Sequence, residues 1–216
     1  MGSIWYEAIW EIYLIKYYMS TIPQIVLEDI ESLKAQWRYD DALKKVNGLL
    51  SRDPTNREAL YQVADIEYRR WEISKAEKPV DFLMRSNKDD AMSWYIKGVL
   101  EMEKTNRSDA KGYFKKALSM LEGDNPEILR CYGLCEYWSG NREQGMTLLI
   151  KSHKQNQLDA EVLLNIIEIS ILERDAPAAK EYIAYYHKHK QELQCFDREA
   201  SYYDDKIVLF EEYLKG

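Results

Sequence analysis

The sequence has little of what breaks helices: its 216 residues include only five prolines and nine glycines. Both residue types are enriched in turns and disordered linkers, so their scarcity argues against a disordered chain. Hydrophobic residues make up 46% and charged residues 31%, which fits a folded domain. A chain of this length can build one medium domain or one repeat array with a continuous core.

Cysteine is also scarce. Cys131, Cys135 and Cys195 do not resemble a disulfide framework, so a reducing, cytoplasmic location is expected. No uncharged apolar run reaches the ~18 residues that a transmembrane helix needs. The N-terminal apolar run is interrupted by Glu7 and Glu11 and has no basic region before it, which makes it a poor signal peptide.

Positive charge is not concentrated anywhere. The formal net charge is −7, and no Lys/Arg block or basic tail rises above the acidic background. Nucleic-acid binding needs an electrostatic footprint of that kind, so no nucleic-acid partner is expected.

Catalytic and metal-binding patterns are missing as well. His187 and His189 lie two residues apart and would point to different sides of a helix. Cys131 and Cys135 share a helix face, but two further zinc ligands are not in register, so buried packing is the expected role of both thiols. No nucleophile elbow or phosphate-binding glycine loop occurs. The sequence therefore predicts no enzyme activity, no metal and no cofactor.

Helical periodicity is what the chain does have, from Ile22 nearly to its end. A small residue recurs at spacings of 34, 34, 35 and 34 positions, and a bulky apolar residue follows each one four positions later. The small residues are Ala42, Ala76, Ala110, Gly145 and Ala179, and the bulky ones are Val46, Val80, Phe114, Leu149 and Ile183. This pattern predicts that each 34-residue unit forms one pair of antiparallel helices.

These residues resemble the tetratricopeptide repeat family. The match is strongest at Trp94, Gly98, Ala110, Phe114, Ala117, Gly133 and Gly145, and Leu50-Ser-Arg-Asp-Pro54 is similar to the usual unit ending. Ile30, Ala64 and Ile167 stand where the family often has glycine. The resemblance implies an all-α, right-handed α-solenoid. We expect five repeats within 19–193, running 23–56, 57–90, 91–125, 126–159 and 160–193, and a capping helix in 194–216.

One stretch lies outside the recurrence: Ile4 to Tyr18, which is almost entirely aromatic and aliphatic. As a helix it would be about 22 Å long, and its apolar circumference would have to be buried. Met1-Gly2-Ser3 is typical of an expression scar. Met19 reads either as a native start, with residues 1–18 added before it, or as an internal apolar residue.

In the family that this chain resembles, the first helix of each unit lines a concave surface. Carried over to this sequence, that surface is rich in Tyr, Met, Trp and Leu and holds seven acidic residues against three basic ones, Lys34, Arg69 and Arg130. The predicted peptide-binding residues are Leu27, Tyr61, Tyr68, Met92, Tyr95, Val99, Met102, Leu134, Tyr137, Trp138 and Leu164.

Such a surface suits an amphipathic helix or an aromatic-rich peptide, so the sequence predicts a protein-interaction scaffold. Its ligand is expected to be an apolar helical segment, with residues 4–18 of the same or a neighbouring chain as one candidate. The alternative is a structural module in which residues 4–18 form a cap or a homodimer contact. The Lys/Asn/Arg clamp with which some family members hold chaperone tails is absent, since Leu27, Glu31, Gln62, Met92 and Ile96 stand at those positions.

Overall fold

The structure is a computed structural model that describes residues 21–86, 90–195 and 199–215. The expectations about residues 4–18 lie outside the described residues. In this part of the chain all the regular structure is α-helical, apart from one isolated bridge between Asp159 and Gln194. The helices are α2 Gln24–Ala35, α3 Tyr39–Leu50, α4 Arg57–Arg69, α5 Ile73–Ser86, α6 Ala91–Glu103, α7 Arg107–Leu118, α8 Pro126–Trp138, α9 Arg142–Gln155, α10 Ala160–Leu172, α11 Ala176–His189 and α12 Ala200–Tyr213.

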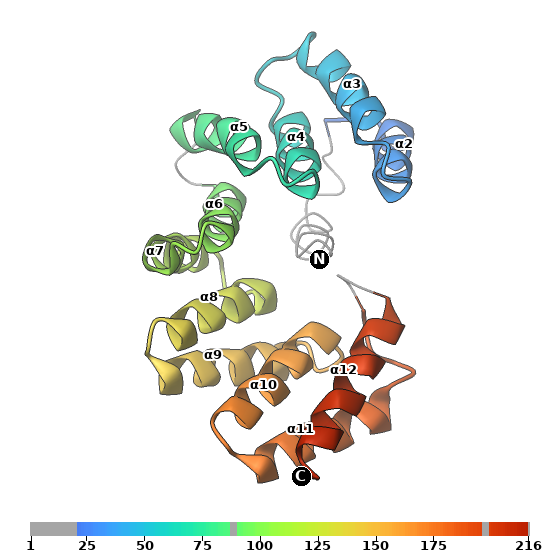
Figure 1. Cartoon of the computed structure of the whole chain (residues 1–216). Helices are drawn as coiled ribbons and strands as arrows, with labels where there is room; N and C mark the ends of the chain where they lie inside the picture. Colours follow the sequence, from blue (N-terminus) through green and yellow to red (C-terminus); the bar gives the residue numbers. More distant parts are fainter. Residues whose placement is uncertain (1–20, 87–89, 196–198, 216) are drawn as a thin grey trace. The chain divides into compact units, whose positions relative to one another are not determined.

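The described helices fall into two compact units. The N-terminal unit covers residues 21–120 with α2 to α7, and the C-terminal unit covers residues 121–215 with α8 to α12. We call the first helix of each pair an inner helix and the second an outer helix. Figure 1 shows the antiparallel pairs α2/α3, α4/α5 and α6/α7 in the first unit, and α8/α9 and α10/α11 in the second.

The recurring small residues lie where the two helices of a pair meet, as the sequence predicts. Ala42, Ala76, Ala110 and Ala179 are fully buried on the outer helices. The fifth, Gly145 on α9, lies so close to α8 that an added Cβ would sit 2.6 Å from the Tyr137 backbone nitrogen. The bulky residues four positions later, from Val46 to Ile183, are also buried. The all-α repeat architecture expected from the spacing is confirmed.

Each inner helix ends in the same kind of turn. The residue after its C-cap has a left-handed backbone: Trp37, Trp71, Thr105, Gly140 and Arg174, with φ between 59° and 96°. Each turn closes with two backbone bonds, as when Trp71 N–H donates to Tyr68 O at 2.8 Å and Glu72 N–H to Glu67 O at 2.9 Å. This is the Schellman arrangement, which satisfies the last carbonyls of a helix.

The C-terminal unit is closed by α12. Tyr203 and Ile207 on this helix are fully buried against Leu164 and Ile167 of α10 and Ile183 of α11. A repeat array needs such a helix because its last pair would otherwise leave an apolar face open. No helix in the described ranges is long and apolar enough to cross a membrane.

Candidate functional site

The inner face of the N-terminal unit is centred on one stripe of α4. Glu58, Tyr61, Asp65 and Tyr68 follow one another at helical spacing and so share a side of this helix. Hydrogen bonds link the stripe to both neighbouring inner helices. Lys34 of α2 donates from Nζ to Asp65 Oδ2 at 2.6 Å, and Tyr68 donates from its hydroxyl to Glu103 Oε1 of α6 at 2.8 Å. The stripe therefore joins α2, α4 and α6 into one polar-bridged surface.

Asp65 is the charged centre of this stripe. It accepts from Lys34 and, at 3.0 Å, from Arg69 Nε, and Lys34 also contacts Glu31 and Gln62. Burial alone would raise the pKa of Asp65, but the positive charges of Lys34 and Arg69 outweigh it and hold the pKa below its usual value. Two of the three predicted basic residues of the inner face are therefore ion-paired to Asp65.

Thr21 and Ile22 lie at the N-terminal end of the same stripe. Both backbone N–H groups donate to Glu58 Oε2, at 3.0 Å and 3.2 Å, and the Thr21 hydroxyl donates to the same oxygen at 3.2 Å. Asn56, which caps α4, also bonds the Thr21 hydroxyl. We call this set of bonds the Glu58 clamp. It fixes the chain before α2 to the first turn of α4.

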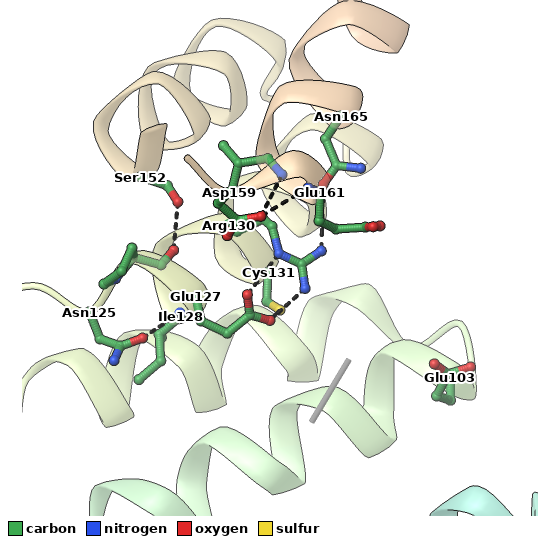
Figure 2. A network of polar contacts seen from close by, with 12 residues as sticks. Glu103, Asn125, Glu127, Ile128, Arg130, Cys131, Ser152, Asp159, Glu161 and Asn165 are labelled. Carbon is green, nitrogen blue, oxygen red and sulfur yellow. Dashed lines mark hydrogen bonds and ion pairs between the residues drawn. The ribbon is translucent and has the colours of Figure 1, made fainter. Parts of the chain in front are cut away.

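The C-terminal unit has its own inner-face network around Arg130 (Figure 2). The buried Arg130 guanidinium pairs with Glu127 on the preceding turn of α8, with Nε 2.8 Å from Glu127 Oε2, and reaches Asn165 Oδ1 of α10 at 3.5 Å. Glu161 of α10 accepts from the Tyr203 hydroxyl of α12 at 3.0 Å. Arg130, the third basic residue predicted for the inner face, is thus also ion-paired, in this case with Glu127.

Asp159 stands beside this network as the N-cap of α10 (Figure 2). Its Oδ1 accepts from the backbone N–H groups of Glu161 at 2.9 Å and Val162 at 3.2 Å. Burial raises the pKa of Asp159 to about 7 although Arg130 and both backbone bonds favour the charged form. This carboxylate therefore changes its charge near neutral pH.

The predicted peptide-binding residues lie in several environments. Most are buried: Leu27, Tyr61, Tyr68, Met92, Tyr95, Val99, Tyr137 and Leu164. Met102 and Leu134 are half-buried, and Trp138 is 51% exposed. Tyr95 and Val99 are fully buried, and Tyr95 packs against Phe114 of the outer helix α7 with ring centroids 6.1 Å apart. Tyr68 and Tyr137 have equivalent hydrogen bonds. The hydroxyl of Tyr68 donates to Glu103, and the hydroxyl of Tyr137 donates to Glu173.

Two further aromatic residues were missed by reasoning from helical periodicity. Trp37 and Trp71 occupy the left-handed turns after α2 and α4 and are 77% and 53% exposed. Each contacts a tyrosine, since Trp37 meets Tyr39 edge-on and Trp71 lies against Tyr68. Their spacing of 34 residues, one repeat, is the signal that could have found them. We call Trp37 and Trp71 the tryptophan rim.

The inner face shows no metal-binding arrangement. Among the residues that the structure describes, no group of three or more His, Cys, Asp or Glu side chains could hold a metal ion. Cys131 and Cys135 are buried, as expected from their helix-face spacing. His187 and His189 have separate carboxylate partners, Glu211 and Glu192.

Solved structures that are similar to this chain are numerous. A thermophilic TPR protein of Thermus thermophilus superposes with a TM-score of 0.68 at 19% identity, over 89% of this chain and 99% of that one. The chain has the tetratricopeptide repeat fold. PilW, a widely conserved type IV pilus biogenesis factor, shares the repeat fold with a TM-score of 0.70 at 18% identity, over 90% of this chain and 94% of its own.

The repeat fold also matches part of a larger protein. The chain superposes with a TM-score of 0.73 on 38% of a chain in the APC/C hetero-tetramer Cut9–Hcn1, at 14% identity and over 93% of its own length. No protein-family model and no curated protein matches the sequence itself. At these identities the likeness concerns the tetratricopeptide repeat fold, which is generally a scaffold for protein interactions.

Proposed function

We propose that the inner face and the tryptophan rim of this chain bind a protein or peptide segment that presents an apolar helical face. The tryptophan rim carries the proposal. A left-handed backbone costs roughly 1 kcal/mol for a residue with a Cβ, and glycine avoids that cost. Gly140 occupies the same place in the fourth pair, so the turn itself accepts glycine. Trp37 and Trp71 instead hold large indole rings in solvent at this position.

Exposed tryptophans suit a contact surface. Trp and Tyr dominate the energetics of protein interfaces because they offer a large rigid apolar area with a polar edge. In the N-terminal unit Trp71 follows α4 and lies against Tyr68 of the stripe, and Trp37 has the equivalent position after α2. Since Tyr68 is fixed by its bond to Glu103, the surface needs little rearrangement to bind.

The charge of the inner face also indicates which kind of partner it would prefer. Within the N-terminal unit, Lys34 and Arg69 both pair with Asp65, and the acidic residues of its inner face outnumber these two bases. A partner helix with lysines or arginines on its polar side would therefore associate faster than an acidic one.

The experiment compares three full-length proteins: the unaltered chain, the double variant W37G/W71G, and T105G. The probe is a labelled amphipathic peptide with leucines and tryptophans at helical spacing and a lysine-rich opposite face. Fluorescence anisotropy should show binding by the unaltered chain and at least tenfold weaker binding by W37G/W71G, because the exposed indoles are removed.

T105G is the matched control. Thr105 has the same left-handed backbone in the third turn, so its replacement relieves the same strain without removing an aromatic ring. We expect T105G to bind like the unaltered chain and to unfold at an equal or higher temperature. Equal peptide affinity in all three proteins, or equal binding of a scrambled peptide, would contradict the proposed function.

A further inference from the structure

A cleft of about 380 Å³ lies between α11 and α12 of the C-terminal unit. Its floor is apolar. Ile183 is 5% exposed and belongs to the core that α12 closes, and Leu214, directly after α12, is half-buried against the same core. Ala184 beside them is exposed, and its small side chain leaves the space between the helices unfilled. The cleft therefore exposes an apolar floor that is continuous with the core of its unit.

Charged side chains bridge α11 and α12 toward one end of this cleft. Lys190 Nζ pairs with Asp204 Oδ1 at 2.8 Å, and His187 Nε2 lies 2.8 Å from Glu211 Oε1. Residue numbers fall along α11 as they rise along α12, so the two helices are antiparallel. In both bridges the basic residue comes from α11 and the acidic one from α12.

This alternation of base and acid does not continue along the cleft. Lys180 and Lys215 line it, so the α11 side and the α12 side each contribute a base there. Both lysines are exposed, and within the described ranges of the chain neither has an ion-pair partner. Among the described residues that line the cleft, Glu211 is the one carboxylate, and it is already bonded to His187. The two lysines therefore flank an apolar floor without a counter-charge from the cleft itself.

We infer that this cleft binds an acidic segment of a partner protein, which places a leucine or phenylalanine side chain on the floor and carboxylates at Lys180 and Lys215. Removal of that apolar side chain from water would supply most of the binding free energy. Charge-assisted hydrogen bonds from the two lysines would orient the segment and reject basic partners.

The openness of the cleft favours a protein segment over a small molecule. Ligand pockets usually enclose most of the surface of a small molecule. Here Ala184 and both lysines are exposed, so the cleft can cover one side of a ligand only. A protein segment needs no more than that, because it supplies an apolar side chain and flanking carboxylates from one continuous chain.

This site goes beyond the proposed function. The inner face and the tryptophan rim are expected to take an apolar helix with lysines or arginines on its polar side. The cleft lies between an outer helix and the capping helix, and its charge selects a partner of the opposite sign. The chain would thus hold two different protein segments.

The test uses full-length protein and a labelled peptide in which one phenylalanine stands between pairs of glutamates. Fluorescence anisotropy measures its affinity for the unaltered chain, K180E/K215E and A184F. We expect K180E/K215E to bind at least tenfold more weakly, because attraction becomes repulsion at both lysines. A184F should also bind at least tenfold more weakly, because its ring would fill the cleft. Since Ala184 is exposed, this substitution should leave the core intact.

K154E/K188E is the matched control, because it makes the same change in net charge within the same unit. Both lysines are exposed and neither lines the cleft, so peptide affinity should be unchanged. A second peptide, with serine in place of phenylalanine, tests the apolar floor and should bind at least tenfold more weakly than the first. Circular dichroism confirms that each variant is folded.

Three outcomes overturn the inference. The first is equal loss of affinity in K180E/K215E and K154E/K188E, which would make binding a matter of net charge. The second is equal affinity for the phenylalanine and serine peptides. The third is an unaltered chain that does not bind the acidic peptide, including the case in which it binds phosphatidylserine vesicles through the two lysines. The proposed function is tested separately, since the acidic peptide should bind W37G/W71G as it binds the unaltered chain.

Discussion

Asp159 shows at the scale of one residue how burial connects stability to pH. Its carboxylate caps α10 through two backbone bonds, yet burial raises its pKa to about 7. In the unfolded chain an aspartate titrates near pH 3.9. Between these two values the folded protein holds a proton that the unfolded chain has released, so this group lowers the free energy of unfolding as pH rises from about 4 to 7.

The first prediction concerns D159N. Asparagine is as good an N-cap as aspartate and carries no charge to bury. At pH 4.5 the folded Asp159 is protonated, and D159N should have nearly the same free energy of unfolding as the unaltered chain. At pH 8 the variant should be more stable, by about 1 kcal/mol or more. Urea unfolding at the two pH values measures the difference.

D175N is its control, because Asp175 caps α11 with a bond to Ala178 N–H at an exposed site. Its effect on unfolding should be the same at both pH values. A D159N effect that does not change between pH 4.5 and pH 8 would show that Asp159 is charged in the folded state throughout this range.

Individual side chains were the hardest feature to predict from sequence. Helical spacing placed Tyr68 and Tyr137 on inner helices, but it could not show that both hydroxyls bond a glutamate one repeat later. Glu58 contacts residues 36 and 37 positions away, and no periodicity marks such a pair. Contacts that depend on a loop path, and not on a repeat, leave no pattern in the sequence.

At the scale of the helix pair, Gly145 explains how α8 and α9 approach. A Cβ at this position would lie 2.6 Å from the backbone nitrogen of Tyr137 and 2.7 Å from Gly133 O, and these backbone atoms cannot shift unless α8 moves. On the partner helix, an added Cβ at Gly133 would meet Gly145 O at 2.9 Å. The two glycines allow a closer contact than alanine would permit.

G145A should therefore lower the free energy of unfolding by about 1–3 kcal/mol, because the two helices must separate to admit one methyl group. Thermal and urea unfolding measure this loss. G112A is the matched control: Gly112 is an exposed glycine inside α7, and an added Cβ there meets nothing within 4 Å. Alanine at that site should stabilise the protein by about 0.5–1 kcal/mol. A G145A protein as stable as G112A would contradict the close-packing explanation.

The pairing of helices was predictable because it rests on a repeated steric need. Every pair requires a small residue at the same place, so the need recurs in the sequence every 34 or 35 positions. The turns were predictable only in position. Their left-handed backbone could not be predicted from the sequence, because four of the five residues with this conformation are not glycine. The helices were therefore predicted correctly, but the tryptophan rim in the turns after them was not predicted.

At the scale of the whole molecule, α12 closes the C-terminal one of the two units. Ile207 on this helix is buried among α10 and α11, while the next residue, Val208, is 53% exposed. In a repeat array each element contacts mainly its neighbours, so a loss at one end stays close to that end.

I207A should lower the free energy of unfolding by about 2–4 kcal/mol through the cavity that it leaves. Hydrogen exchange should show the loss of protection in α10, α11 and α12 and little change in α4. V208A, one residue away on the same helix, should change neither quantity by more than about 0.5 kcal/mol. Equal loss of protection in α4 and α10 would indicate that the whole chain unfolds as one cooperative block.

The left-handed turns after the inner helices also bear on which single-base changes the fold would tolerate. A tryptophan codon differs from a glycine codon by a single base, so the change to glycine at Trp37 or Trp71 lies one mutation away. That change should not harm folding, because it relieves the backbone at an exposed site. Backbone strain alone therefore favours glycine at both positions, whereas the contacts of the indole rings with Tyr39 and Tyr68 favour tryptophan. Arg174 has the same left-handed backbone in the equivalent turn of the C-terminal unit, so glycine would relieve the backbone there too.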